Sequence, residues 1–318
     1  MGLDGLIPGH VLADLTRLAD LVAPSPVGLD VGRRRLRADC PIEDVADAVY
    51  ECWYLAPPVG PPQSAPGANA MAGRRSLAPL LRASVAAATR FETGWVVLAA
   101  LDRGVCVAGK DTHQRQVRPG DYVGLGRPGA PVAPGEQLAV TARVDTVEDD
   151  TRWWATRSPA GEPSGDLGRF YLHPRADTVP SVLHRLTRRL DEAPFAWSVK
   201  CPIDPAGYRR PDSLVLFVPR PAVAQTRDLV CEVAAEAEAL LVAHCPPLTL
   251  WVADGVAYAD DPGPGSSFGI SRCRALAPGV VAVARQALSG DEAVDTLLQA
   301  LISTGIDPRA PWLSPVPP

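Results

Sequence analysis

The hydrophobic pattern of residues 166–218 alternates, becomes helical and alternates again, which predicts a strand, a helix and a second strand. In the first strand, the alternation places Arg169, Tyr171 and His173 on one face. If the helix covers the other, apolar face, these three side chains project from the open one. The second strand adds Lys200 to the same face. The pattern therefore predicts a cationic surface that can exchange protons, on one face of a sheet.

The same reasoning divides the chain into three regions and predicts the α+β class. Residues 1–92 show mainly helical spacing and contain a loop rich in proline and glycine at 56–70. Residues 93–160 alternate with period two, which predicts a small antiparallel β module. Residues 161–318 predict an α+β domain whose mixed sheet is covered by helices.

The composition is that of a globular protein without a general affinity for polyanions. Charged residues make up 21% of the chain and hydrophobic residues 47%, and the net charge is -5. A negative net charge argues against binding to nucleic acid or to anionic membranes, because both need a positive field. No apolar run reaches transmembrane length and no signal segment is seen, so we expect a cytoplasmic protein. The seven cysteines lack CxxC spacing and indicate neither a disulfide framework nor a zinc site.

Lysine usage draws attention to one position. The chain has 31 basic residues, of which only Lys110 and Lys200 are lysine. Lysine can lose its proton and act as a base, whereas arginine stays charged. A lysine kept among so many arginines is therefore a candidate base. The alternative is that the two lysines have no special role and occur by chance in an arginine-rich chain. Lys110 directly precedes Asp111 and is interpreted as a solvated lysine of a loop.

Two further groups of arginines are candidates for binding an anion. Arg209 and Arg210 lie in the polar loop before the strand predicted at 213–218. Arg272 and Arg274 follow a glycine-rich loop in the first turns of a predicted helix, whose free N–H groups favour anions. Guanidinium groups match phosphate oxygens in a bidentate way.

Each of these assignments has a structural alternative. Arg209 and Arg210 could simply pair with the nearby carboxylates Asp204 and Asp212. Arg274 could brace its own helix, and His173, which precedes a proline at the end of a strand, could be an ordinary surface histidine.

Several of these segments together resemble the HopA-type family of bacterial type III effectors. They are RFY at 169–171, the lysine that ends the following strand, YRRPDSLVLF at 208–217, and VADGVAYADDP followed by SSFGISRCR within 252–274. The resemblance covers about residues 94–290 and is clearest over 166–275. Homologues of this kind occur in gene clusters for class V lanthipeptides and thioamitides, where they act beside a kinase-like partner to dehydrate serine and threonine. The family is also distantly similar to phosphothreonine lyases, which use a lysine base, a histidine acid and arginines that bind phosphate.

The resemblance implies a phosphoserine or phosphothreonine lyase without a metal or organic cofactor. Its substrate would be a precursor peptide phosphorylated by a separate kinase. Lys200 would be the base, and the acid would be Tyr171 or His173, because the lysine–histidine spacing of the lyases falls on Arg169 and Tyr171, and His173 follows two residues later. The phosphate clamp implied by the resemblance would draw on Arg169, Arg209, Arg210, Arg272 and Arg274.

A base at neutral pH sets a demanding condition on Lys200. An ordinary lysine has a pKa of about 10.4, so a neutral amine near pH 7.5 requires a depression of about three units, or about 4 kcal/mol. Burial and nearby arginines act in that direction.

The rival hypothesis is a non-catalytic subunit that holds a phosphopeptide or organises a kinase, and a third is an effector that acts on a host protein. Replacing Lys200 distinguishes the first two, since only a lyase needs the amine for turnover.

Overall fold

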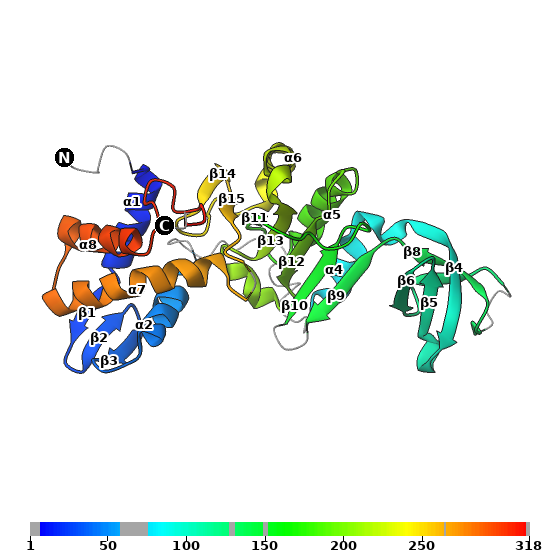
Figure 1. Ribbon diagram of the computed structural model, residues 1–318, viewed down its shortest axis with the longest axis horizontal. Helices are drawn as coiled ribbons and strands as arrows, with labels where there is room; N and C mark the ends of the chain where they lie inside the picture. Colours follow the sequence, from blue (N-terminus) through cyan, green and yellow to red (C-terminus); the bar gives the residue numbers. More distant parts are fainter. Residues whose placement is uncertain (1–6, 58–75, 127–130, 149–151, 264, 316–318) are drawn as a thin grey trace.

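The computed structural model describes residues 7–57, 76–126, 131–148, 152–263 and 265–315. It is an α+β protein in which three parts follow one another along the long axis (Figure 1). A largely helical part lies at one end, an antiparallel sheet with covering helices lies in the middle, and a small β module forms the other end. The α+β class expected from the sequence is confirmed.

The central sheet has the strand order β14-β15-β11-β13-β12-β10-β9, and every pairing is antiparallel among the described residues. The sheet is therefore not the mixed one that the sequence favoured. Its strands are β9 (Val144–Glu148), β10 (Trp153–Arg157), β11 (Leu167–Leu172), β12 (Ser198–Pro202), β13 (Leu214–Pro219), β14 (Leu250–Ala253) and β15 (Val256–Asp260).

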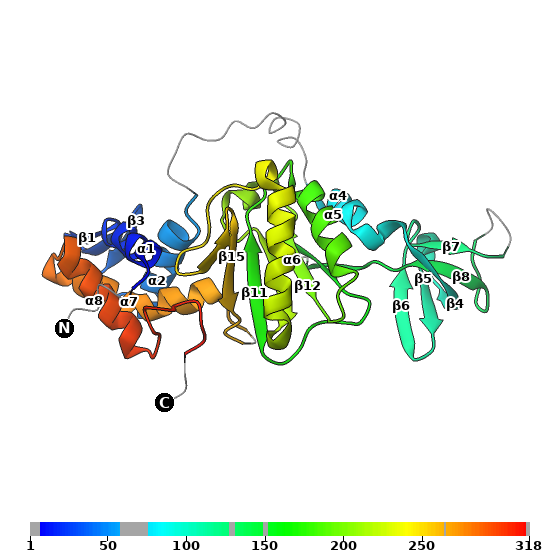
Figure 2. The same ribbon diagram turned by 90° about the horizontal axis from the view of Figure 1, so that it is seen from above.

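Two helices cover one face of this sheet, as Figure 2 shows for α6. They are α5 (Val179–Leu190) and α6 (Val223–Glu236), followed by the short η7 (Glu238–Leu240). The apolar stripe predicted for α5 is fully buried, because it packs on the apolar side chains of the strands, including Phe170 and Leu216. The predicted strand–helix–strand unit is confirmed, and its apolar face is the core of the central part.

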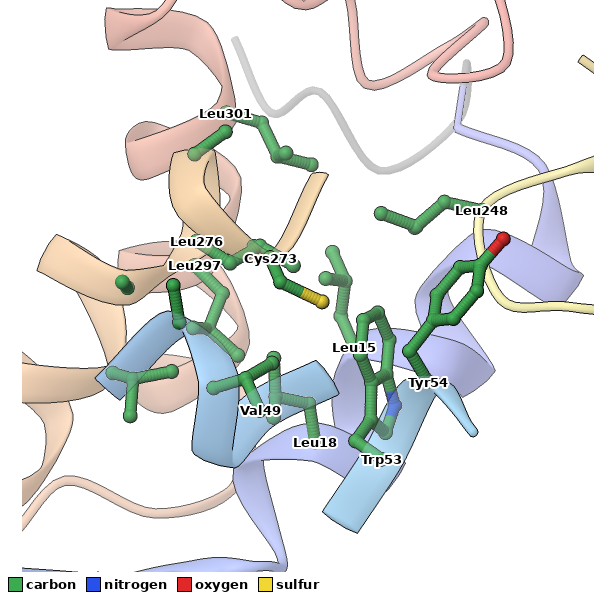
Figure 3. Close-up of a cluster of buried hydrophobic side chains, with 14 of the residues drawn as sticks. Leu15, Leu18, Val49, Trp53, Tyr54, Leu248, Cys273, Leu276, Leu297 and Leu301 are labelled. Atoms are coloured by element: carbon green, nitrogen blue, oxygen red, sulfur yellow. The ribbon is translucent and has the colours of Figure 1, made fainter. Parts of the chain in front are cut away.

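Segments from the N-terminal and C-terminal parts of the chain form a second hydrophobic core (Figure 3). Trp53 and Tyr54 come from the N-terminal segment, and Cys273 and Leu297 come from helices near the C-terminus. The elements that build this part are α1 (Gly9–Ala19), β1 (Val22–Ser25), β2 (Gly28–Val31), β3 (Arg34–Arg37), α2 (Ile42–Val49), the π-helical turn η2 (Tyr50–Tyr54), α7 (Phe268–Gln286) and α8 (Gly290–Ser303). This core also includes Tyr171 and Val215, so part of the sheet face expected to be open is covered.

The β module is a five-stranded antiparallel sheet of order β6-β5-β4-β8-β7 with a small core of its own. A hairpin joins β4 to β5 through the short η4 turn (Asp102–Gly104). The strands are β4 (Phe91–Ala100), β5 (Cys106–Lys110), β6 (His113–Val117), β7 (Tyr122–Gly124) and β8 (Gln137–Thr141). Helix α4 (Ala78–Ser84) and η3 (Ala86–Thr89) precede the module in the chain and pack against α5 of the central part.

Some local predictions differ from the structure. The N-terminal region contains the strands β1, β2 and β3 as well as helices. Strand β10 falls within the β module predicted at 93–160, but it pairs with β12 in the central sheet. Helix α7 continues through Pro278, although a proline inside a helix usually ends or kinks it. Most of the predicted loop at 56–70 lies outside the described residues.

Candidate functional site

The strand register brings three of the predicted residues to one sheet face. Tyr171 pairs with Val215 and Val215 with Lys200, so these three side chains form one row across the sheet. In the next row, Arg169 pairs with Phe217. Residues directly opposite each other in neighbouring strands point to the same side. The shared face of Arg169, Tyr171 and Lys200 thus follows from the alternation seen in the sequence.

Three cations and two aromatic rings alternate across this face, an arrangement that we call the cation–aromatic ladder. The amine Nζ of Lys200 lies 5.3 Å from the ring centroid of Trp153 and 5.3 Å from that of Phe217. The guanidinium of Arg210 lies 5.3 Å from the Trp153 centroid on one side, and that of Arg169 lies 5.1 Å from the Phe217 centroid on the other. Each ring is thus within reach of two cations, and Lys200 is the central one.

A groove runs along the ladder on the Lys200 side. Its larger section is a cavity of about 790 Å³ whose lining includes Arg169, Lys200 and Phe217. A smaller section of about 120 Å³ extends toward β9 and shares Glu162, Ser198, Lys200 and Phe217 with the larger one. We call the two sections together the Lys200 groove.

The N-terminus of α7 opens into this groove. Ser266 and Ser267 line the cavity, and the hydroxyl of Ser267 caps the helix by accepting a hydrogen bond of 3.2 Å from the N–H of Ile270. Helix α7 is 19 residues long, so its first turn carries a partial positive charge. The anion-favouring helix start predicted after the glycine-rich loop therefore lies beside Lys200 and Arg169.

Arg169 fixes the loop that leads into α7. Its Nε donates to Asp261 at 2.8 Å, its Nη2 donates to the carbonyl of Ser266 at 2.9 Å, and it hydrogen-bonds to Tyr171. Burial would lower the pKa of Arg169, but the contacts with Tyr171 and Asp261 outweigh it and raise the pKa. The side chain is thus a buried, permanently charged group at the wall of the groove.

Tyr171 lies under this wall. It is 3% exposed, and its ring centroid is 6.4 Å from that of Phe268 at the start of α7. Burial raises its pKa well above the ordinary value, so the hydroxyl stays protonated at physiological pH. Tyr171 is not among the residues that line the Lys200 groove, and its hydrogen bond to Arg169 connects it to the wall.

His173 is placed elsewhere. It follows the end of β11, is 2% exposed, and has its Nδ1 3.2 Å from the carbonyl oxygen of His244. It is therefore not the surface histidine considered as an alternative. Burial lowers the pKa of His173, which favours the neutral imidazole. It does not line the Lys200 groove.

Three of the five arginines of the predicted clamp line cavities, Arg169 in the Lys200 groove and the other two elsewhere. Arg209 and Arg210 line a separate cavity of about 470 Å³ between η5 (Pro205–Arg209) and the N-terminal segment. Arg210 donates to Asp212 through Nε at 2.5 Å and through Nη2 at 2.8 Å, and it also donates to the hydroxyl of Tyr50 at 3.0 Å. The pairing of Arg210 with Asp212 considered as an alternative is therefore present.

The remaining two arginines do not join either group. Arg272 is 1% exposed, and it donates at 2.6 Å to each of the carbonyls of Pro311 and Leu313. Burial lowers the pKa of Arg272 to about 10. Arg274 is exposed on α7 and makes no ion pair within the described chain. Arg272 thus fastens the C-terminal segment, and neither side chain lines the Lys200 groove.

Neither the two aromatic residues of the ladder nor the tyrosine of the N-terminal segment that contacts Arg210 was identified from the sequence. Trp153 and Phe217 share the Lys200 face by strand alternation, a signal that was present in the sequence. Tyr50 reaches Arg210 across 160 positions of the chain, and no local pattern could have indicated that contact.

The described part of the chain gives two negative observations. It contains no group of three or more histidine, cysteine, aspartate or glutamate side chains placed to hold a metal ion. In the same described ranges, no helix combines the length and the apolar character needed to cross a membrane.

Comparisons with known proteins agree with the resemblance seen in the sequence. The chain superposes on an effector protein of Pseudomonas syringae pv. syringae strain 61 with a TM-score of 0.51 and 15% identity, over 98% of this chain and 100% of the effector. An effector protein of Pseudomonas syringae pv. tomato strain DC3000 gives a TM-score of 0.42 and 18% identity over 53% of this chain and 66% of that one. No curated protein sequence matches the chain. The family model for the HopA1 effector protein family matches residues 149–313, more than half of the chain. The chain belongs to the HopA1 effector protein family.

Proposed function

We propose that this protein is a lyase that eliminates phosphate from phosphoserine or phosphothreonine in a peptide. The observation that carries the proposal is the Lys200 groove, in which an amine, the buried cation Arg169 and the N-terminus of α7 lie together. An amine can remove a proton, and the other two groups favour an anion. The elimination needs both a base for the proton and a group that stabilises the departing phosphate.

In the proposed reaction, neutral Lys200 removes the proton on the α carbon of the phosphorylated residue. The electron pair of that C–H bond forms the Cα–Cβ double bond, and the Cβ–O bond breaks with its electron pair leaving on phosphate. The products are dehydroalanine or dehydrobutyrine, inorganic phosphate and a protonated lysine. The departing phosphate takes up one proton from water, and the lysine returns one proton to solvent before the next turnover.

The departing phosphate is stabilised by charge in this scheme. Arg169 and Ser267, the N-cap residue of α7, line the groove, whereas Tyr171 is buried behind Arg169 and His173 lies outside the groove. We therefore assign to Tyr171 the role of positioning Arg169. A preorganised cation in a site with little water is an effective partner for developing negative charge.

The groove suits a peptide better than a free amino acid. Its two sections run from β9 to the start of α7, past Lys200. Following the family resemblance, the substrate would be a lanthipeptide-type precursor peptide, phosphorylated by a separate kinase that works as a partner. The proposed elimination uses side chains of the protein alone.

One observation favours a second candidate function, the holding of a phosphopeptide without turnover. Lys200 lies between two aromatic rings, and cation–π contacts stabilise an ammonium group more than a neutral amine. A permanently charged Lys200 would bind phosphate and would not remove a proton.

Mass spectrometry of a phosphothreonine peptide incubated with the purified protein separates the two candidates. The lyase predicts loss of phosphoric acid and a product that adds a thiol. Lys200→Ala should abolish the product, whereas Lys110→Ala, which replaces the other lysine of the chain, should retain it. A phosphopeptide that binds and stays intact, with or without a kinase partner, would establish the binding function instead.

A further inference from the structure

A second pocket at the other end of the cation–aromatic ladder has an excess of positive charge. The cavity of about 470 Å³ is lined by three arginines, Arg33, Arg209 and Arg210, and by one carboxylate, Glu51. Glu51 is already paired with Arg34. Arg33 and Arg209 are exposed, and neither forms an ion pair within the described part of the chain. An anionic group that entered this pocket would therefore meet uncompensated cations.

Arg210 is held rigidly at the inner wall of this pocket. Asp212 accepts two hydrogen bonds from it, the hydroxyl of Tyr50 accepts a third, and the Trp153 ring packs against its guanidinium. These contacts use Nε and Nη2, and Nη1 has no hydrogen-bond partner among the described residues. A guanidinium fixed in this way needs little further ordering to bind a ligand.

The pocket is close to Lys200. The guanidinium of Arg210 and the amine of Lys200 each lie 5.3 Å from the Trp153 centroid, so they are no more than twice that distance apart. An extended peptide rises about 3.3 Å per residue. Side chains about two to four residues apart in one extended peptide therefore span from Lys200 to this pocket.

We propose that the pocket formed by Arg33, Arg209 and Arg210 is an anion subsite of the Lys200 groove. It binds an anionic side chain, either a carboxylate or a second phosphate, two to four residues from the phosphorylated residue in the same peptide. This inference rests on the proposed function, because it assumes that the phosphorylated residue occupies the Lys200 groove. It gives the protein a preference for acidic or multiply phosphorylated peptides.

The test is fluorescence polarisation with phosphothreonine peptides that carry one aspartate at an offset of two, three or four residues on either side, each paired with an asparagine peptide. Arg33→Ser combined with Arg209→Ser removes the exposed cations, and Arg103→Ser at the η4 turn of the β module is the matched control. Because both subsite arginines are exposed, we expect the double variant to keep the wild-type melting temperature.

At one or more offsets, the asparagine peptide should bind the wild-type protein about three- to fivefold more weakly than the aspartate peptide, as expected for the loss of an exposed ion pair. The double variant should bind both peptides of that pair equally, and the Arg103→Ser protein should behave as wild type. Replacing the aspartate by a second phosphothreonine shows which anion is preferred.

Two failures can be told apart. If the phosphopeptide binds but aspartate has no effect at any offset, or the effect persists in the double variant, the subsite proposal is wrong and the proposed function stands. If phosphorylated and unphosphorylated peptides bind alike, both proposals fail.

Discussion

Trp153 and Phe217 set the conditions under which Lys200 can work. Each contact of the amine with a ring stabilises the ammonium form by about 0.5–1 kcal/mol when exposed and by about 2 kcal/mol when desolvated. The two flanking guanidiniums oppose that effect, but Asp212 and Asp261 neutralise them in part. A neutral amine at physiological pH needs a further contribution, and we infer that a bound peptide supplies it by excluding water from the groove.

At the residue scale, Tyr171→Phe tests whether Tyr171 is a general acid. Removing the hydroxyl deletes one hydrogen bond to Arg169, so we expect phosphopeptide affinity to fall by about 1 kcal/mol and turnover by no more than about tenfold. Steady-state kinetics with the phosphothreonine peptide measures both. A loss of about 10²- to 10⁴-fold in turnover with unchanged affinity would instead make Tyr171 the acid.

His244 should make stability depend on pH. Burial, assisted by Arg17 and His173, lowers the pKa of His244 to about 4 from 6.5. The unfolded chain therefore takes up the proton first, and stability that is full above pH 6.5 is lost as the pH falls toward 4. Allowing for partial exposure of the ring, we expect the free energy of unfolding to drop by about 1 kcal/mol between pH 7 and pH 5 from this group.

Urea unfolding at the two pH values measures this loss. His244→Asn should flatten the dependence, and His113→Gln, which changes an exposed histidine of β6, should leave it unchanged. A wild-type protein that is equally stable at both pH values, or a His244→Asn protein with the full loss, would contradict the assignment.

At the element scale, local pattern was sufficient wherever one element buries a single regular face. The apolar stripe predicted a helix at α5 and the alternation predicted a strand at β11, and both predictions are confirmed. The strands β1, β2 and β3 escaped prediction because each has only four residues, and they contain Pro24, Gly28 and three arginines, which weaken a strand signal. A proline usually interrupts a helix, but α7 continues through Pro278, and the neighbouring Gly279 packs closely against Ala300 of α8.

The cap of α7 can be tested against that of α8. The Ser267 hydroxyl accepts a hydrogen bond from the N–H of Ile270, whereas the side chain of Ser289 makes no cap bond to α8. We expect Ser267→Ala to lower the free energy of unfolding by about 1 kcal/mol and Ser289→Ala to lower it much less. Equal losses in urea unfolding would show that the Ser267 cap does not hold the start of the helix.

At the scale of the whole molecule, the site depends on contacts that no local pattern reveals. Tyr50 of the N-terminal segment reaches Arg210, and Tyr54 packs against Gly269 so closely that a Cβ there would lie 2.4 Å from the ring. The sequence placed Arg169 and Lys200 on one face correctly, but it could not show that Arg210 faces a second pocket or that Arg272 binds the C-terminal segment. Those placements depend on how distant parts of the chain pack.

The β module should open before the rest of the molecule. Its core has seven buried apolar residues within the described chain, whereas the central sheet and the helical part each have an extensive core. We expect amides of β4, β5 and β8 to exchange with an opening free energy at least about 2 kcal/mol below that of β11 and β13. Hydrogen exchange followed by mass spectrometry measures this difference, and equal protection would mean that the molecule unfolds as one unit.

The central claim is that Lys200 is the base of a phosphate elimination, and single-turnover phosphate release from a phosphothreonine peptide tests it most directly. We predict that Lys200→Ala slows release by about 10²- to 10⁴-fold while peptide affinity changes little, and that Lys110→Ala releases phosphate at the wild-type rate. Release by the Lys200→Ala protein at close to the wild-type rate would contradict the assignment of the base. No release by any form, with tight binding that depends on Lys200, would identify the groove as a phosphopeptide holder.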